Sequence, residues 1–422
     1  MKSFALVDCN NFYASCEKLF RPDLKHTPVV VLSNNDGCVV ARSKEVKQLG
    51  IKMGVPFFKM QDEVTRYGIV AFSSNYALYA DISNRVMTTL EELAPKLEIY
   101  SIDEAFLDLT GVNHCCELTA FGQQIRQIIY QWIGISVGVG IAPTKTLAKL
   151  ANHTAKTYPA TQGVVDLTDP ARQRKLMAIT PVEDVWGVGR QLSKHLKAIG
   201  IDTALKLADV EPAWIKKQFN VVLERTVREL NGQSCLKLDD VTPIKKQIIS
   251  SRSFGERITE KHVMRDAIGC YAARATEKLR QQKQFARSLT VFIRTNPFSD
   301  SEPYYSNAAT YQFPIPTDDT RDMLEKSHQL LDSIWRSGYR YMKGGVMLND
   351  FYHEGVYQPD LFCEQKIRAN SKPLMQILDK INHSGKGKVW FAGEGITKEW
   401  GMKREHLSPA YTTKWKDLPV VK

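Results

Sequence analysis

The order of short apolar segments and amphipathic segments in the first 150 residues most constrains the fold of this chain. Between residues 118 and 132 the apolar side chains fall on one helical face. Residues 135–141 alternate apolar with small residues, which is typical of a strand. The full expected order is a strand at 4–7, a helix at 10–18, strands at 97–101 and 105–109, a helix at 118–132, a strand at 135–141 and a helix at 144–153. Strand, helix, two strands, helix and strand is the order of a ferredoxin-like α+β sheet.

The rest of the chain predicts a helical region and a second α+β unit. Residues 169–230 have helical patterning, and the Gly-, Asp- and Pro-containing stretch 231–243 is the best candidate for a linker. A second βαββαβ order is expected from a strand at 247–254, a helix at 261–283, strands at 288–295 and 304–313, a helix at 320–337 and a strand at 343–349. The last 70 residues are expected to be irregular.

Charge is distributed unevenly along the 422 residues, a length that favours roughly three domains. Residues 1–110 hold 12 Lys and Arg against 14 Asp and Glu, whereas residues 243–294 hold 12 against 4, a net charge of +8. A near-neutral first part and a basic later segment are typical of a carboxylate site joined to a polyanion-binding surface. A solvated basic face explains the same charge about equally well.

Composition excludes several classes of protein. Hydrophobic residues make up 43% and charged residues 24% of the chain, which excludes wholesale disorder. No run of 18 apolar residues is present, so no membrane span is expected. The eight cysteines form no C-x-x-C pair, which favours a reduced, cytoplasmic protein without a structural metal.

Three carboxylates are candidates for metal binding. Asp8 closes the first expected strand, and Asp103 and Glu104 lie between two later strands. The first and third strands of a ferredoxin-like sheet are neighbours, so these side chains can converge. Three oxygen ligands on rigid strands suit Mg²⁺, which takes its other ligands from water and phosphate. Each residue alone is more often a turn residue, so the hypothesis depends on the joint pattern.

The joint pattern extends to three longer segments. These are DCNNFYASCE at 8–17, YSIDEAF at 100–106 and VGIAPTKTLAK at 139–149. They closely resemble the three signature segments of Y-family translesion DNA polymerases, and the resemblance covers about residues 3–350. Within that family the segment VVLSNNDGC at 30–38 and the long C-terminal extension are most similar to the UmuC-type branch, the catalytic subunits of DNA polymerase V.

The resemblance implies an α+β multidomain right-hand polymerase. It would have a ferredoxin-like palm, small fingers, a helical thumb with a helix-hairpin-helix, and a βαββαβ little finger. The expected boundaries are 1–20 and 75–168 for the palm, 21–74 for the fingers, 169–240 for the thumb, 243–352 for the little finger and 353–422 for a C-terminal extension.

The resemblance also implies the chemistry. The expected activity is error-prone translesion synthesis in SOS mutagenesis, in which deoxynucleotides (dNTPs) are added to a primer 3′-end opposite damaged template. Two Mg²⁺ ions would be held by Asp8, Asp103, Glu104 and the Cys9 carbonyl, and would activate the 3′-hydroxyl and neutralise the departing pyrophosphate. Tyr13, with Phe12 beside it, matches the steric gate that excludes a ribose 2′-hydroxyl. A half-buried helical aromatic is the alternative for Tyr13.

Further residues match positions that bind the triphosphate and the primer-template DNA. The triphosphate positions are Lys44, Lys47 and Lys156; where many family members have Tyr and Arg, this chain has Lys44 and Lys47, which carry charge without a guanidinium fork. Phosphate contacts in the hairpin are expected at Gly187, Gly189, Arg190 and Lys194. Strand arginines of the little finger are expected to grip the DNA backbone, namely Arg252, Arg257, Arg287 and Arg294.

The C-terminal part implies protein partners. Gln358, Leu361 and Phe362 match the Q-x-x-L-F pattern by which bacterial polymerases bind the sliding clamp. The extension resembles the one that implies contact with a processed UmuD-type dimer and with RecA. Expected partners are therefore primer-template DNA, dNTP, the UmuD-type dimer, RecA and the sliding clamp, without a membrane.

Two other functions fit parts of the sequence. A nucleotidyl cyclase also carries carboxylates on a ferredoxin-like sheet, but it would not explain the hairpin, the basic segment or the clamp motif. A non-catalytic DNA-repair scaffold would use the hairpin and the basic segment, but it leaves Asp8, Asp103 and Glu104 unexplained together.

Overall fold

The computed structural model describes residues 2–238, 245–357, 368–396 and 398–418. The chain divides into two compact units, which we describe separately. Unit 1 comprises residues 1–33, 37–242 and 406–422, and unit 2 comprises residues 34–36 and 243–405. Among the described residues, none of the helices combines the length and the apolar character needed to cross a membrane.

Unit 1 is built on a five-stranded sheet with the order β5-β6-β1-β7-β8. Its strands are β1 (Phe4–Cys9), β5 (Lys96–Ile99), β6 (Glu104–Asp108), β7 (Val137–Ala142) and β8 (Val164–Asp166). β1 lies between β6 and β7 and is antiparallel to both, while β7 and β8 are parallel. The expected ferredoxin-like order is confirmed, with β1 central.

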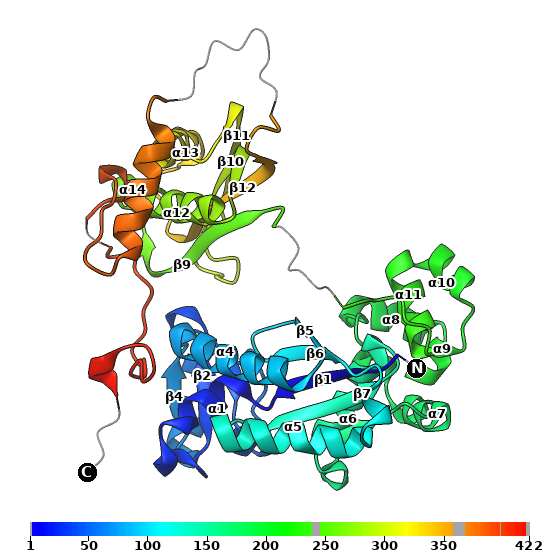
Figure 1. The fold of residues 1–422 in the computed structure, drawn as a ribbon. Helices are drawn as coiled ribbons and strands as arrows, with labels where there is room; N and C mark the ends of the chain where they lie inside the picture. The colour runs from blue at the N-terminus through cyan, green and yellow to red at the C-terminus, as the bar shows by residue number, and fades with distance from the viewer. Residues whose placement is uncertain (1, 239–244, 358–367, 397, 419–422) are drawn as a thin grey trace. The chain divides into compact units, whose positions relative to one another are not determined.

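Three helices cover this sheet on its two faces (Figure 1). They are α4 (Tyr76–Leu93), α5 (Leu118–Ile133) and α6 (Lys145–Thr157). Ala5 and Val7 of β1 pack in the core that also contains α4 and α5. Leu6 alternates with them and packs in the core that contains α6. The period of two along β1 therefore directs Leu6 and Asp8 to the α6 face.

Glycine lets α6 approach β7 closely. A Cβ atom on Gly140 would lie 2.2 Å from the Asn152 backbone nitrogen and 2.4 Å from the Ala148 carbonyl oxygen. A Cβ atom on Gly138 would instead meet the flexible Lys156 side chain, at 3.2 Å. Gly140 is therefore required for the contact between α6 and the sheet.

A smaller sheet precedes α4. It has the order β3-β2-β4, with strands β2 (Val29–Leu32), β3 (Val39–Arg42) and β4 (Val70–Ser73). Short helices α1 (Phe12–Leu19), α2 (Lys44–Gln48) and α3 (Gln61–Tyr67) accompany it. The three strands, α2 and α3 lie within residues 21–74, the range expected for the fingers.

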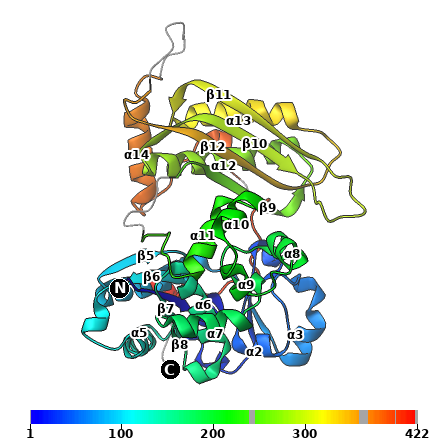
Figure 2. The same cartoon turned by 90° about the vertical axis from the view of Figure 1, so that its right-hand side faces the viewer.

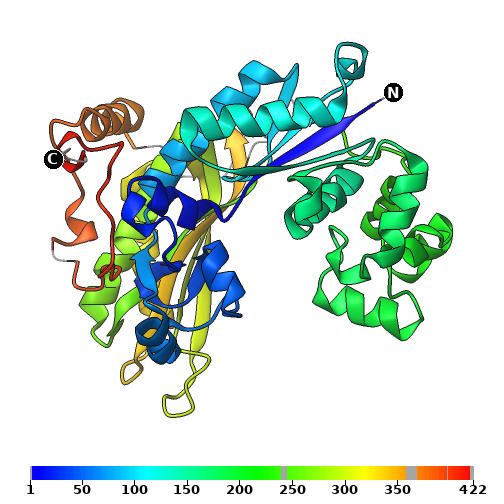
Figure 3. The same ribbon diagram turned by 90° about the horizontal axis from the view of Figure 1, so that it is seen from below.

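Residues 170–230 form helices, as expected, and gather in a group of their own within unit 1 (Figures 1 and 3). They are α7 (Pro170–Ile179), α8 (Arg190–Ala198), α9 (Ala204–Ala208), α10 (Pro212–Gln218) and α11 (Val221–Leu230). The fully buried Glu229 of α11 accepts hydrogen bonds from the backbone N–H and hydroxyl of Thr146, at 2.9 and 2.8 Å. This carboxylate ties the helical group to the first turn of α6.

A buried carboxylate joins α1, α4 and the end of the chain. Glu17 is fully buried and accepts a hydrogen bond of 2.6 Å from the hydroxyl of Tyr79. The C-terminal segment reaches the same region, because the Asn75 side chain donates a hydrogen bond to Ser408 Oγ at 2.9 Å. Burial raises the pKa of Glu17 to about 7. The hydrogen bonds from Tyr79 and Ser408 lower the pKa, but burial is the larger effect.

Unit 2 is built on a four-stranded sheet with the order β11-β10-β12-β9 (Figure 2). Its elements are β9 (Ile248–Ile258), α12 (Lys261–Gln281), β10 (Gln284–Arg294), β11 (Ser306–Thr317), α13 (Thr320–Ile334) and β12 (Tyr341–His353). This is the expected βαββαβ order. Leu289, Val291 and Ile293 of β10 pack in one core with α12 and α13. The intervening residues of β10 therefore face away from the helices.

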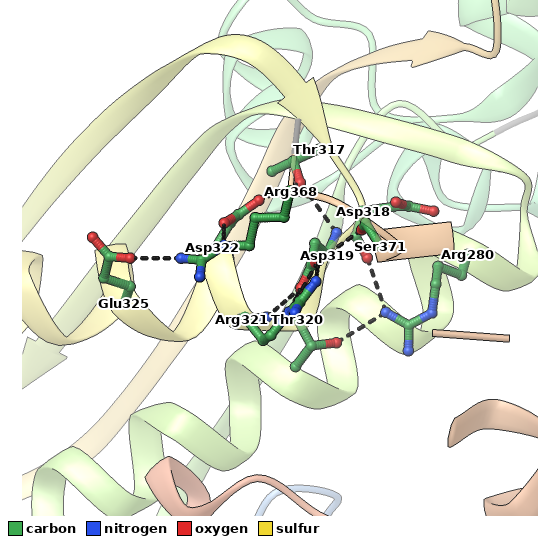
Figure 4. Close-up of polar contacts among 10 residues, drawn as sticks. All are labelled: Arg280, Thr317, Asp318, Asp319, Thr320, Arg321, Asp322, Glu325, Arg368 and Ser371. Atoms are coloured by element: carbon green, nitrogen blue, oxygen red, sulfur yellow. Dashed lines mark hydrogen bonds and ion pairs between the residues drawn. The ribbon is translucent and has the colours of Figure 1, made fainter. Parts of the chain in front are cut away.

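The expectation that the last 70 residues are irregular is wrong for α14 (Ser371–His383). Its sequence carries apolar residues at helical spacing, which the expectation overlooked: Leu374, Met375, Ile377, Leu378 and Ile381. Of its side chains only Ser371 and Met375 are buried. Polar contacts hold the helix, and Figure 4 draws the one between Ser371 and Asp319. Ser371 donates to Asp319 at 2.6 Å, and the Arg280 guanidinium donates twice to Asp379, each at 2.7 Å.

We predict that Gly140→Ala disrupts the packing of α6 against β7. Its Cβ would meet backbone atoms that cannot rotate away, and overpacking of this kind costs about 1–3 kcal/mol. The measurement is the thermal unfolding midpoint, which should fall by several degrees. Gly138→Ala is the matched control and should change the midpoint by much less. Equal midpoints for the two variants would contradict this account of α6.

We predict that Glu17 makes unit 1 less stable as the pH rises from about 5 to 8. Its pKa is raised in the folded state to about 7 from 4.5, so its contribution is fully present below pH 4.5 and is lost as the pH rises through 7. A shift of this size corresponds to about 3 kcal/mol. Glu17→Gln should remove this part of the pH dependence in urea unfolding, whereas Glu92→Gln, at an exposed position of α4, should not. A wild-type slope retained in Glu17→Gln would disprove the assignment.

Candidate active site

One stripe of α6 carries polar side chains that contact the sheet. Lys145 donates to Glu98 of β5 at 2.6 Å, and Lys149 donates to Glu104 of β6 at 2.8 Å. One to two turns further on, Asn152 and Lys156 continue the stripe. Asn152 donates to the backbone carbonyls of Leu6 and Gly138, at 3.2 and 2.8 Å, and Lys156 forms an ion pair with Asp8. The spacing of three and four residues places all four on one helix face.

Asp8 and Glu104 are direct cross-strand neighbours, because their Cα atoms are paired in the β1–β6 register. Burial raises the pKa of Asp8 to about 7; the charge of Lys156 lowers it, and the hydrogen bond with Glu104 raises it. The pKa of Glu104 lies below its usual value, because the hydrogen bonds from Asp8 and Lys149 outweigh burial, which raises it. Two carboxyls in contact thus resist carrying two negative charges together.

Asp103 lies beside this pair. Its backbone carbonyl accepts a hydrogen bond of 2.8 Å from the Cys9 N–H, and its carboxylate accepts one of 2.6 Å from the Ser101 hydroxyl. Asp8, Cys9 and Asp103 line one cavity of about 330 Å³. The structure therefore brings together the carboxylates that the sequence places a hundred residues apart; Glu104 adjoins Asp8 without lining the cavity.

Phe12 and Tyr13, at the start of α1, line the same cavity. Phe12 is buried in the core, whereas Tyr13 is half-buried. The Tyr13 ring stacks on Tyr79 with a centroid separation of 4.4 Å and an interplanar angle of 16°. Because Tyr79 is itself hydrogen-bonded to buried Glu17, this stack holds the Tyr13 ring in place.

Cations line the cavity beside the carboxylates. Lys47 and Lys156 are among the lining residues, as expected, but Lys44 is exposed at the start of α2 and does not line it. Burial lowers the pKa of Lys47, and the charges of Arg42 and Lys156 lower it further. The sequence analysis missed Arg42, which lines the cavity and donates to the Ile51 carbonyl at 2.5 Å. The sequence signal that could have identified Arg42 is its position at the end of β3.

The expected hairpin precedes α8. Gly187 has a φ of +92°, which favours glycine, and Gly189 is the residue before the first turn of α8. A Cβ atom on Gly189 would meet no atom within 4 Å, so the backbone there is open to an approaching group. Arg190 and Lys194 are both exposed on α8. The four residues lie together at one end of α8.

The strand arginines of unit 2 lie on different faces of its sheet. Arg294 of β10 follows Ile293 of the helix-side core and faces away from it. Arg287 follows the core residue Ala286 at a β-bulge, which breaks the alternation and directs it away from the core as well. Lys343, the Cα partner of Arg294 on β12, was missed; burial and the Arg294 charge lower its pKa. Arg252 instead lines a cavity together with α12, so the structure does not bring it to the open face. The Arg257 Nε atom lies 3.8 Å from the Glu302 Oε2 atom, so Arg257 forms an ion pair within the protein.

The clamp motif lies outside the described residues, since Gln358, Leu361 and Phe362 fall in the undescribed stretch 358–367.

Family models match three segments of the chain. The impB/mucB/samB family matches residues 7–153, and its C-terminal domain matches residues 245–361. A domain of unknown function matches residues 372–421.

Relatives match over nearly the full length. The chain is 57% identical to protein UmuC of Salmonella typhimurium over 421 residues, which is 99% of this chain and 100% of the relative. It is 49% identical to protein MucB of Escherichia coli over 417 residues, 99% of each chain. Among solved structures, a Y-family DNA polymerase chimera superposes with a TM-score of 0.68 at 20% identity, over 83% of this chain and 99% of the other.

Proposed function

The chain belongs to the impB/mucB/samB family and is an error-prone translesion DNA polymerase of SOS mutagenesis, and we propose that Asp8, Asp103 and Glu104 form its catalytic centre. The observation that carries this proposal is the convergence of Asp8 on β1, Glu104 at the start of β6 and Asp103 just before it. Lys149 and Lys156 pair with two of them.

The donor set fits a hard divalent cation. Y-family polymerases depend on divalent metals, and carboxylate and carbonyl oxygens are the ligands that Mg²⁺ prefers. We assign Asp8, Asp103, Glu104 and the Cys9 carbonyl to two Mg²⁺ ions. When bound, the ions would lower the pKa of the primer 3′-hydroxyl and stabilise charge on the departing pyrophosphate. The raised pKa of Asp8 supports this fit, because nearby positive charge would favour the ionised form of both carboxyls.

The cations of the cavity would bind the triphosphate of the incoming dNTP. Lys47, Lys156 and Arg42 all line the cavity of about 330 Å³, so their charges face the space beside the carboxylates. Lys44 is exposed and does not line the cavity, so it would contact the triphosphate only at its periphery. Tyr13 would act as the steric gate: its ring, held by Tyr79, would contact the sugar where a ribose carries its 2′-hydroxyl.

Two surfaces would hold the primer-template DNA through its backbone. One is the hairpin with Gly187, Gly189, Arg190 and Lys194, where open backbone N–H groups and two exposed cations adjoin. The other is the open face of the unit 2 sheet with Arg287, Arg294 and Lys343. Neutralising several phosphates would make DNA binding fall steeply with salt. Arg257 would join this surface only by giving up its contact with Glu302.

We assign three protein partners on the basis of the family. Gln358, Leu361 and Phe362 would bind the sliding clamp, which raises the effective concentration of a weakly bound polymerase at the primer end. The C-terminal extension would contact a processed UmuD-type dimer and RecA. A protein that works on chromosomal DNA with these partners would be cytoplasmic.

We predict that the double variant Asp103→Asn/Glu104→Gln loses Mg²⁺-dependent primer extension past an abasic site. The rate should fall by at least roughly 100-fold, the scale of losing one charge-stabilising group in an active site. Extension is measured with the protein alone and with a processed UmuD-type partner plus RecA filament. Asp108→Asn, at the other end of β6, is the control and should retain activity. Extension that persists in the double variant would contradict the carboxylate assignment, and DNA binding without extension by the wild type would favour the scaffold.

We predict that Tyr13→Ala admits ribonucleotides. Removing the ring should raise the ratio of kcat/KM for ribonucleotides over deoxynucleotides at least tenfold, because the 2′-hydroxyl no longer meets a side chain. Single-nucleotide incorporation kinetics measure this ratio. Tyr130→Ala removes an exposed tyrosine of α5 and should leave the ratio unchanged. Unchanged selectivity in Tyr13→Ala would remove Tyr13 from the gate.

A further inference from the structure

Unit 2 contains a cavity of about 560 Å³ that the proposed polymerase function does not use. One wall is formed by β9 and α12, and the other by the described part of the extension between Leu378 and Met402. The two walls approach each other closely, because a Cβ atom on Gly269 of α12 would lie 2.0 Å from the Gly393 carbonyl oxygen. The size is within the range of about 300–1,000 Å³ typical of small-molecule sites.

Two buried hydrogen-bond donors in the cavity wall have no partner. Tyr271 is 5% exposed and Trp400 is 9% exposed, and both line the cavity. Neither the Tyr271 hydroxyl nor the Trp400 indole N–H has a hydrogen-bond partner within the part of the chain that the structure describes. Their rings meet edge to face with centroids 5.4 Å apart. A buried donor without a partner costs about 1–3 kcal/mol. Both donor atoms are closed to solvent in this structure, so a ligand with acceptor atoms would recover this energy by drawing the two side chains toward the cavity.

The acidic groups of the wall are already engaged. Asp379 receives both Arg280 contacts, and Arg280 also donates to the Asp318 carbonyl and the Thr320 hydroxyl, each at 2.9 Å (Figure 4). Glu277 lies 3.3 Å from His383, and Glu394 accepts a hydrogen bond from a backbone N–H at 3.0 Å. Arg280 and these three carboxylates therefore stabilise the wall itself.

Two other cations of the wall are not engaged. Arg252 and Arg274 line the cavity and make no ion pair or side-chain hydrogen bond with any described residue. Their charges act on the neighbouring Lys278. Burial lowers the pKa of Lys278, and the charges of Arg274, Lys245 and Arg252 lower it further. Positive charge without a counter-ion, next to two unpartnered donors, favours an anion with several acceptor oxygens.

We propose that this cavity binds the phosphate group of a nucleotide, through Arg252, Arg274, the Tyr271 hydroxyl and the Trp400 indole N–H. A phosphate carries enough acceptor oxygens for these four donors. Trp390 lines the same cavity with 55% of its surface exposed, and it has no ring partner among the described residues. Its indole offers a face on which the base can stack. The phosphate has two possible sources, a free mononucleotide or a nucleotide of a single strand.

Calorimetric titration of the full-length protein tests the proposal. The probes are thymidine 5′-monophosphate, thymidine and a short oligothymidylate, in buffer with EDTA so that the carboxylate site of unit 1 holds no divalent cation. We expect the monophosphate to bind with one site per chain and at least tenfold more tightly than thymidine. Arg252→Gln and Trp400→Phe should each weaken it at least fivefold, and Tyr271→Phe, which removes one hydroxyl, provides a variant with minimal risk to folding.

Arg265→Gln is the matched control, since Arg265 lies on α12 and contacts Asp332 rather than the cavity. It should bind the monophosphate as the wild type does. Binding of oligothymidylate that weakens in the cavity variants but not in Arg265→Gln, without monophosphate binding, would support the strand as the source. The proposal is overturned if neither phosphate probe binds, if thymidine binds as tightly as its monophosphate, or if Arg252→Gln, Trp400→Phe and Tyr271→Phe all bind both phosphate probes like the control.

Discussion

The contact between α6 and the central sheet of unit 1 positions most of the proposed active site. Four side chains of one helix stripe reach four strands, and two of them, Lys149 and Lys156, contact Glu104 and Asp8. The contact depends on Gly140, because any Cβ atom there would collide with the α6 backbone. The close packing that buries α6 against the sheet therefore also places Lys149 and Lys156 next to the carboxylates.

Burial explains how these carboxylates behave as a group. Asp8 and Glu104 face each other across two strands in a partly buried site, where like charges repel strongly and each needs a counter-charge. The lysines of α6 supply that charge within the protein. Burial lowers the pKa of the neighbouring Lys47, and the charges of Arg42 and Lys156 in the same cavity lower it further.

The C-terminal extension is structural in both units. Trp400 packs in the core of the unit 2 sheet, and Tyr411 packs in the core of unit 1, where its ring stacks on Phe20 at 4.6 Å. Near it, Ser408 hydrogen-bonds to Asn75 and contributes to the environment of Glu17. The described part of the extension therefore supports α1 and α4, the helices that carry Tyr13 and Tyr79.

Local pattern was sufficient for the elements with strong periodicity. The strands of the two α+β sheets, apart from β8, and α5 follow from alternation and from a continuous apolar face. The three-stranded sheet of β2, β3 and β4 was not expected. α14 carries apolar residues at helical spacing from Leu374 to Ile381, so the expectation of an irregular segment overlooked a signal that the sequence contains. Arg42 was missed because its role depends on which cavity its strand end adjoins.

The sequence by itself determined the strand order, the three carboxylates and the family, because these depend on residue type, spacing and order along the chain. Only the tertiary structure decided which residues meet. It placed Arg42 in the cavity, left Lys44 outside it, and turned Arg252 away from Arg287 and Arg294. The physical reason is that the direction of a side chain depends on strand register and on what packs against each face, and neither is encoded in local sequence alone.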